Sequence, residues 1–310
     1  GAAIHAAMTG SEAPWLETER GIPPEQRWSF AVDAPLMSMC VGRESCETFL
    51  ADTSGGLYLL DGRGQVVTLT RGFQHLTGIA WSDSGNGGAA SIGERTLCLL
   101  DGSLKVVWSV ELSDEILDVD VDPFANYVAA ALANGNNLVF DRNKSRVCRF
   151  DTVRPLSYIR FVPSVPQIVG VAEYGLVCCH GGSRARTWYE ATWSNAGDVC
   201  LSGDPRHLHV AAFNLGVQAY SVDEGTTRGA MLVDGTPNHV ACSYTGERLA
   251  ITTLERHLYW VDDHGELIWA SRLADDAKAV CCDALGNGLA CGFASGRIVR
   301  LEWGLPEARP

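Results

Sequence analysis

Short apolar runs separated by polar turns recur along the whole chain. One run occurs seven times, as SMCVG, GIAWS, DVDVD, YIRFV, DVCLS, HVACS and AVCCD. Consecutive runs are 40 or 41 residues apart, measured between the apolar residues Met39, Ile79, Val119, Ile159, Val199, Val240 and Val280. This spacing predicts a structural repeat of about forty residues.

A second set of positions keeps the same period, eleven residues before each apolar marker. These positions are Trp28, Thr68, Trp108, Cys148, Trp188, Gly229 and Trp269. Between the two sets, segments such as AASIGERTLCLLD and LACGFASGRIVRLEW have the pattern of a strand, a polar turn and another strand. Four strands in forty residues, with no helical period of 3.6, predict an all-β fold of the β-propeller type.

The two ends of the chain complete each other. The last repeat, from Val280, has three strands before it ends at Trp303, whereas the N-terminal segment EQRWSFAVDAPLMSMCVG matches the interior segment ELIWASRLADDAKAVCCD. We therefore predict a seven-bladed propeller over residues 26–303, with four strands in every blade and the strand around Trp28 outermost in the last blade. Residues 1–25 are expected to lie outside the repeats, loosely on the surface, and 304–310 to form a C-terminal tail.

An aspartate ends the third strand of four repeats, seven residues before the tryptophan position, at Asp61, Asp101, Asp141 and Asp262. With the turn glycines Gly64 and Gly265, this pattern resembles the D-x-x-G-x-x-x-W repeat of quinoprotein-like propellers and, more distantly, WD repeats. Leu104 and Lys144 replace the glycine elsewhere, and the Gly-His and Trp-Asp dipeptides of WD repeats are not found. Physically, the aspartate accepts turn amides, the glycine permits a positive φ, and the tryptophan fills the gap between blades.

The quinoprotein resemblance implies an enzyme alternative, since those dehydrogenases hold a quinone and calcium in the propeller axis beneath a disulfide between adjacent cysteines. The chain has two adjacent pairs, Cys178-Cys179 and Cys281-Cys282. Both lie in predicted strands, where neighbouring side chains point to opposite faces, so a disulfide within either pair is not expected. We therefore expect no cofactor.

Composition narrows the function classes. The 310 residues include 24 Lys plus Arg and 37 Asp plus Glu, a net charge of −13, which disfavours binding to nucleic acid or to a membrane surface. Apolar runs are all too short to span a bilayer. The eleven cysteines form no CxxC pair and mostly lie in apolar runs, which favours buried, unreactive thiols in a reducing cytoplasm.

Candidate chemistry is sparse. The common catalytic motifs are missing, and the closest histidine pair, His207 and His209, has no third ligand at a suitable spacing, so no metal site is predicted. Asp120 and Arg160 occupy equivalent positions on neighbouring innermost strands. We expect them to form an ion pair that lines or closes the central channel, with a ligand anchor as the alternative.

Two sets of loops should emerge on one face of the propeller: those from each outermost strand to the next innermost strand, and those between second and third strands. We predict that this face binds a partner, with Phe73 and Trp193 as anchors because large rings at loop tips commonly fill partner pockets. The predicted contact residues are Phe73, His75, Asp114, Glu115, Arg154, Trp193, His239, Asp275 and Asp276.

The sequence thus favours a non-catalytic scaffold, a monomer or a module of a larger assembly, that binds a protein or a peptide. A basic partner is expected because the chain is acidic. The alternative is a sensor or an enzyme, similar to quinoprotein dehydrogenases, that binds a small molecule or a metal in the axial channel through Asp120 and Arg160.

Overall fold

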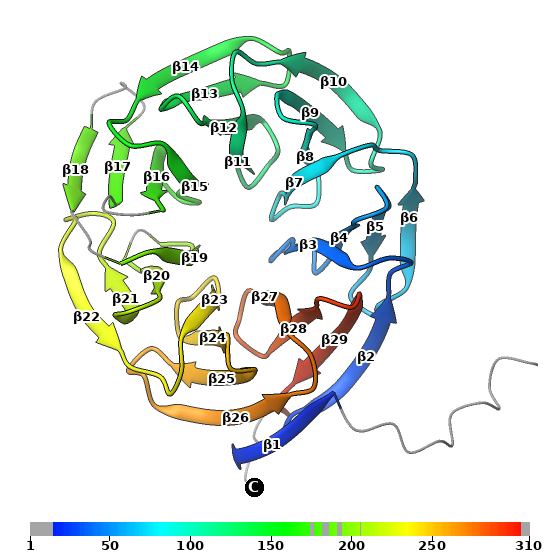
Figure 1. Cartoon of the computed structure of the whole chain (residues 1–310), viewed down its shortest axis with the longest axis vertical. Helices are drawn as coiled ribbons and strands as arrows, with labels where there is room; N and C mark the ends of the chain where they lie inside the picture. Colours follow the sequence, from blue (N-terminus) through cyan, green and yellow to red (C-terminus); the bar gives the residue numbers. More distant parts are fainter. Residues whose placement is uncertain (1–14, 174–176, 182–185, 191–193, 205, 305–310) are drawn as a thin grey trace, which may run out of the picture.

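The structure, a computed structural model, describes residues 15–173, 177–181, 186–190, 194–204 and 206–304, with the backbone alone described at 177–180 and 186–190. Within these ranges the regular elements are β-strands, and they form antiparallel sheets arranged around a central axis (Figure 1). The prediction of a β-propeller is confirmed.

Six sheets have four strands each, and their innermost strands are β3, β7, β11, β15, β19 and β27. The first three are β3 (Leu36–Val41), β4 (Thr48–Asp52), β5 (Leu57–Leu60) and β6 (Val66–Thr70); β7 (Leu76–Trp81), β8 (Gly87–Ile92), β9 (Thr96–Asp101) and β10 (Val106–Glu111); β11 (Ile116–Val121), β12 (Tyr127–Leu132), β13 (Asn136–Asp141) and β14 (Arg146–Asp151).

The other three are β15 (Leu156–Phe161), β16 (Gln167–Ala172), β17 (Val177–Gly181) and β18 (Arg186–Glu190); β19 (Ala196–Leu201), β20 (Leu208–Ala212), β21 (Gly216–Tyr220) and β22 (Thr227–Met231); β27 (Ala277–Cys282), β28 (Gly288–Phe293), β29 (Arg297–Glu302) and β2 (Glu25–Ala31). In the last sheet β2 pairs antiparallel with β29, with Trp28 opposite Arg300.

The prediction of seven blades with four strands each is wrong, because one sheet has five strands. It contains β23 (Pro237–Cys242), β24 (Arg248–Thr253), β25 (His257–Asp262), β26 (Leu267–Leu273) and, outside them, β1 (Leu16–Gly21). β1 pairs with β26 from Leu16 opposite Leu273 to Gly21 opposite Trp269. Residues 16–21 are therefore part of a sheet and not a loose surface segment.

Two contacts explain why the fifth strand forms. Trp15 packs against Phe293 with ring centroids 5.1 Å apart and the rings tilted by 46°, in the gap between this sheet and the next. Gly21 has φ +83°, and a Cβ atom there would lie 2.1 Å from the Ile268 carbonyl oxygen, so the bend between β1 and β2 requires glycine. Half of the residues in the strand LETERG are charged, and the strand lies outside the repeat, so neither the apolar pattern nor the period indicated it.

The aspartate turns are held by hydrogen bonds within each turn, and the outer tryptophans pack on them from the neighbouring sheet. In each of the four turns the aspartate Oδ1 accepts two backbone N–H groups, two and four residues ahead, at 2.8 to 3.0 Å. The outer tryptophans pack on the turn of the neighbouring sheet: the ring of Trp28 lies against Gly64, and Nε1 of Trp108 donates to the Arg142 carbonyl at 3.0 Å. The predicted turn and packing roles are confirmed at these positions.

The core lies between the sheets. A typical cluster joins Phe49, Leu57 and Leu59 of one sheet to Trp81 and Leu100 of the next, all buried. Because successive sheets share such apolar contacts, the innermost strands are held at fixed positions around the axis, where the candidate site lies.

Candidate functional site

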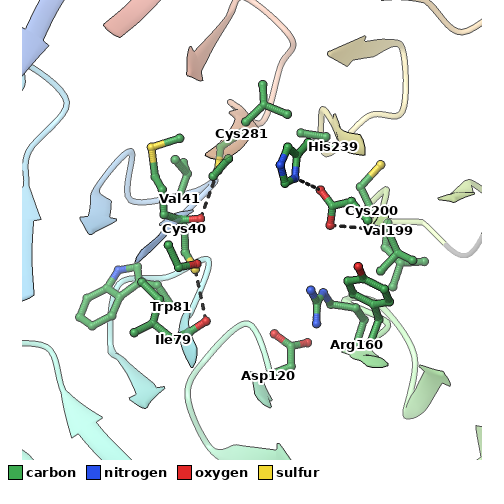
Figure 2. Close-up of a pocket in the computed structure, with 18 of the residues that line it drawn as sticks. Cys40, Val41, Ile79, Trp81, Asp120, Arg160, Val199, Cys200, His239 and Cys281 are labelled. Carbon is green, nitrogen blue, oxygen red and sulfur yellow. Dashed lines mark hydrogen bonds and ion pairs between the residues drawn. The ribbon is translucent and has the colours of Figure 1, made fainter. Parts of the chain in front are cut away.

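A cavity of about 610 Å³ runs along the axis and is lined by the innermost strands (Figure 2). Its walls differ in chemistry. Charged and polar groups such as Asp120, Arg160 and His239 lie on β11, β15 and β23, on the side that also carries Cys200 of β19, whereas Cys40 and Ile79 line the opposite side. The channel predicted from the sequence is therefore present, and both Asp120 and Arg160 line it.

Arg160 forms its ion pair with Asp118 and not, as predicted, with Asp120. Asp118 lies two residues before Asp120, on the same face of β11. Arg160 Nη1 contacts Asp118 Oδ2, because residues 118 and 120 both point into the channel and the stagger between sheets places 118 opposite the guanidinium. Asp120 Oδ2 instead accepts the backbone N–H of Phe161 at 2.8 Å. Burial raises the pKa of Asp120 to about 7, against the opposing effect of Arg160.

The carboxylates also connect neighbouring innermost strands. Asp118 Oδ2 accepts the N–H of Ile159 at 2.8 Å, and Asp198 Oδ2 accepts the N–H of Val240 at 3.1 Å. Neighbouring innermost strands belong to different sheets. The carboxylate oxygens therefore accept backbone N–H groups that the carbonyls of a paired strand would accept within one sheet. Asp118, Asp120 and Asp198 thus have a structural role, because they connect neighbouring strands. The sequence pattern alone could not distinguish this role from ligand binding.

His239 was predicted on the partner-binding face, but it lines the channel. Its Nδ1 lies 3.7 Å from Asp198 Oδ2 (Figure 2). Residue 239 belongs to β23 itself, two positions before the equivalent of Arg160, and strand alternation turns its side chain to the axis.

One end of the channel is closed by Arg43, which follows β3. Its Nη1 donates to the Leu201 carbonyl at 2.7 Å, its guanidinium lies 5.1 Å from the centroid of the Tyr244 ring, and its Nε lies 3.3 Å from Asp83 Oδ1. The side chain therefore reaches from β3 across the axis to the β19 and β23 side. Sequence analysis missed Arg43, because it lies in a turn that has no basic residue at the equivalent position of the other repeats.

The opposite end of the channel opens on the two predicted sets of loops, which form one face. We call it the loop face. Its two loop sets are joined by backbone hydrogen bonds, for example from Gly93 N to the His75 carbonyl, from Phe213 N to Asn195 and from Leu254 N to Thr236, at 2.7 to 3.0 Å. These bonds fix the loops to each other around the ring.

Several predicted contact residues on this face serve the fold. Phe73 is half-buried and packs against the cluster that contains Phe49 and Leu57. Asp275 accepts the backbone N–H of Ser295 at 3.0 Å, and Asp276 pairs with Arg256 at 2.9 Å.

The remaining predicted residues on this face differ in exposure. His75, Glu115 and Arg154 are exposed, and Asp114 is half-buried and accepts the backbone N–H of Glu115 at 2.8 Å. Trp193 lies outside the described residues.

Aliphatic side chains that sequence analysis overlooked are more exposed than Phe73. Val153 is 94% exposed, Leu232 84% and Leu254 57%, all in loops of this face. The side chain of Leu232 extends over Gly216. The backbone N–H of Leu254 donates to the carbonyl of Thr236, which ends the loop that begins at Leu232. Unlike ring residues, single leucines in loops give no sequence signal that separates them from core residues.

The described cysteines are free thiols, and Cys281 and Cys282 are among them. Burial raises the pKa of Cys40 and Cys291 to about 12 and also raises that of Cys98, Cys281 and Cys282. Cys46 is exposed, and Cys242 differs from the others because a hydrogen bond from Cys200 lowers its pKa. The side chains of Cys178 and Cys179 lie outside the described part.

No protein-family model matches the chain, and no curated protein sequence matches it. Solved structures do. The β-propeller domain of Cps50 (Swd1) from Myceliophteria thermophila matches with a TM-score of 0.78 and 18% identity, over 91% of this chain and 100% of that chain. With 1846 matching chains in all, the likeness establishes the β-propeller fold and does not select one function. In the described part, no helix is long and apolar enough to span a membrane.

Proposed function

We propose that this propeller is a non-catalytic scaffold that binds a protein or a peptide on its loop face. The observation that carries the proposal is the exposure of Leu232, Leu254 and Val153 on that face, because exposed apolar side chains at loop tips favour partner contact over solvation. The likeness to a β-propeller domain is compatible with this role but does not establish it.

The opposite face offers less. It carries exposed side chains too, such as Phe124 at 55% and Leu285 at 68%. Its turns, however, are tight hairpins whose amides are bonded to Asp and Ser side chains within the turn, and Arg43 closes the channel there. Few groups on that side remain to adapt to a partner.

The charge of the chain supports a basic partner. The net charge is −13, and an acidic surface accelerates association with a basic protein or peptide. Glu115 and Asp276 are exposed on the loop face, so they are the groups expected to contribute to this attraction. Their removal should slow association and weaken its salt dependence more than it speeds dissociation.

The proposal is tested by affinity capture followed by direct binding measurements. Proteins captured by the wild-type chain are compared with those captured by Leu232→Ser/Leu254→Ser and by the control Phe124→Ser/Leu285→Ser, which changes two exposed apolar residues on the opposite face. A captured partner is then titrated calorimetrically. The loop-face variant should lose about 1 to 4 kcal/mol of affinity and the control almost none; equal affinities would contradict the proposal.

The structure changes the expected behaviour of Phe73. Because Phe73 packs against Phe49 and Leu57, Phe73→Ala should lower stability, and any loss of affinity should follow from that. The variant is therefore less suitable than the leucine variant as a test of binding.

A small ligand in the channel is the second candidate function. The cavity of about 610 Å³ and its charged wall favour it, although the carboxylates of Asp118, Asp120 and Asp198 are already bonded to backbone amides. If the channel is the binding site, a small charged ligand should raise the melting temperature of the wild type but not of Arg160→Gln. Ligands that stabilise both proteins equally would exclude the channel.

A further inference from the structure

Two thiols and an imidazole meet beside the channel, where β19, β20 and β23 pack together. Cys200 of β19, His209 of β20 and Cys242 of β23 each offer one ligand atom, and these three atoms lie within 4.8 Å of one another. His209 and Cys242 are buried, and Cys200 is half-buried. Cys200 and Cys242 line the cavity, whereas His209 lies behind them.

The backbone explains how the three residues converge. Cys200 and His209 are direct partners in the ladder between β19 and β20, so their side chains point to the same side of the sheet. Cys242 comes from β23, the innermost strand of the neighbouring sheet, which packs against both β19 and β20. The cluster therefore spans the boundary between two sheets, and rigid strands fix all three positions.

The imidazole has an unsatisfied nitrogen. Nδ1 of His209 is buried and has no hydrogen-bond partner among the residues that the structure describes. The ring is stacked parallel to His207, with centroids 6.1 Å apart, which fixes its plane. A buried, unpartnered nitrogen is unfavourable in an ordinary core, so its presence in an imidazole that offers a ligand atom within 4.8 Å of two thiol sulfurs points to a ligand.

The electrostatic surroundings favour a divalent cation with two thiolates. Two thiolates, one neutral imidazole and one divalent cation sum to zero charge. Arg43 lies near both thiols and acts on them electrostatically, but its charge is balanced by Asp83.

We propose that Cys200, His209 and Cys242 form a binding site for a thiophilic divalent cation, with Zn²⁺ as the ion of choice. Thiolate and imidazole ligands suit zinc, and ligand atoms that lie within 4.8 Å of one another need only small side-chain shifts to reach the shorter edges of a coordination tetrahedron. The fourth position faces the channel, because the two cysteines line it. A water molecule or a channel ligand can complete the coordination there. The proposal is independent of partner binding on the loop face.

The first test is metal titration of the full-length, reduced and metal-stripped chain. Zn²⁺ in competition with a chromophoric chelator should show one tight site, and Co²⁺ should give thiolate-to-metal charge transfer together with the intense d–d bands of four-coordinate cobalt. Absence of tight binding, or a cobalt spectrum without thiolate charge transfer, would overturn the proposal.

Variants locate the site. Cys200→Ser, Cys242→Ser and His209→Gln should each lower Zn²⁺ affinity by more than about 100-fold, beyond the usual effect of losing an outer-shell partner. Cys282→Ala is the matched control, since Cys282 is a buried thiol of the next innermost strand and lies outside the ligand set. Wild-type affinity in Cys242→Ser, or an equal loss in Cys282→Ala, contradicts the assignment.

If a ligand variant fails to fold, X-ray absorption on the zinc-loaded wild type decides. Two sulfur atoms and one imidazole in the first shell support the site, whereas a shell of oxygen and nitrogen alone rejects it.

Discussion

The Asp120 carboxylate connects two neighbouring sheets and has a raised pKa. Its oxygen accepts the N–H of Phe161 on the neighbouring sheet, while burial in the channel raises its pKa from 3.8 to about 7. Because the folded state holds this proton more tightly than the unfolded state, the Asp120 contribution to stability falls as pH rises from about 3.8 to about 7 and is constant above that range.

Asp120→Asn keeps the acceptor oxygen and removes the titration. Relative to the wild type, the variant should gain about 1 to 3 kcal/mol of unfolding free energy between pH 4 and pH 7. Urea denaturation of both proteins across this range measures the difference. A difference that does not change with pH would show that Asp120 titrates normally.

Lys144 adopts a conformation that the repeat otherwise gives to glycine. Its φ is +67°, close to the +78° of Gly64 at the equivalent turn, and its side chain is exposed. A left-handed conformation costs an ordinary residue about 1 to 2 kcal/mol. This strain is larger than the conformational entropy that a glycine loses when it is fixed in the same turn. Lys144→Gly should therefore stabilise the protein by about 0.5 to 1 kcal/mol.

The matched control is Asn143→Gly, in the same turn but at a residue without a positive φ. It should be neutral or destabilising by about 0.5 to 1 kcal/mol. Equal effects of the two substitutions in thermal and chemical denaturation would refute the account of this turn.

At the scale of elements, β1 extends one sheet beyond the repeat and attaches through Trp15. The indole packs against Phe293 in a tilted arrangement, and the guanidinium of Arg297 lies 5.5 Å from the centroid of the indole. Trp15→Ala should cost about 1 to 3 kcal/mol, less than for a fully buried tryptophan because Trp15 is half-buried.

The control for this strand is Ile22→Ala, because Ile22 follows β1 and is 67% exposed. Its melting temperature should equal that of the wild type. If Trp15→Ala also leaves the melting temperature unchanged, β1 does not contribute to the stability of the sheet.

What the sequence predicted depended on local signals. The strands and the aspartate turns were predictable because alternation and turn chemistry act within a few residues and repeat every forty. β1 was not, since its pairing with β26 leaves no periodic trace. The Arg160 partner was misassigned by two residues because the stagger between neighbouring sheets cannot be derived from equivalent repeat positions.

The cysteine and histidine cluster was missed for the same reason. The ladder partners Cys200 and His209 belong to one hairpin and could have been found from its register. Cys242 comes from the next sheet and is one position away from the repeat equivalent of Cys200, so only the three-dimensional stagger brings it close.

At the scale of the whole molecule, the ring separates two surfaces with different properties. One face has tight turns and a channel end closed by Arg43, and the other has hydrogen-bonded loops with exposed Val153 and Leu232. The central claim is that a partner binds the second surface. Figure 1 shows how the strands place these loops around the ring.

Hydrogen exchange of the chain with and without its captured partner tests this claim most directly. Binding on the loop face should slow amide exchange in residues 232–236 and 254–256 and leave 122–126 and 283–287 on the opposite face unchanged. Protection confined to 122–126 and 283–287, or to the innermost strands, would contradict the account and assign binding to the other face or to the channel.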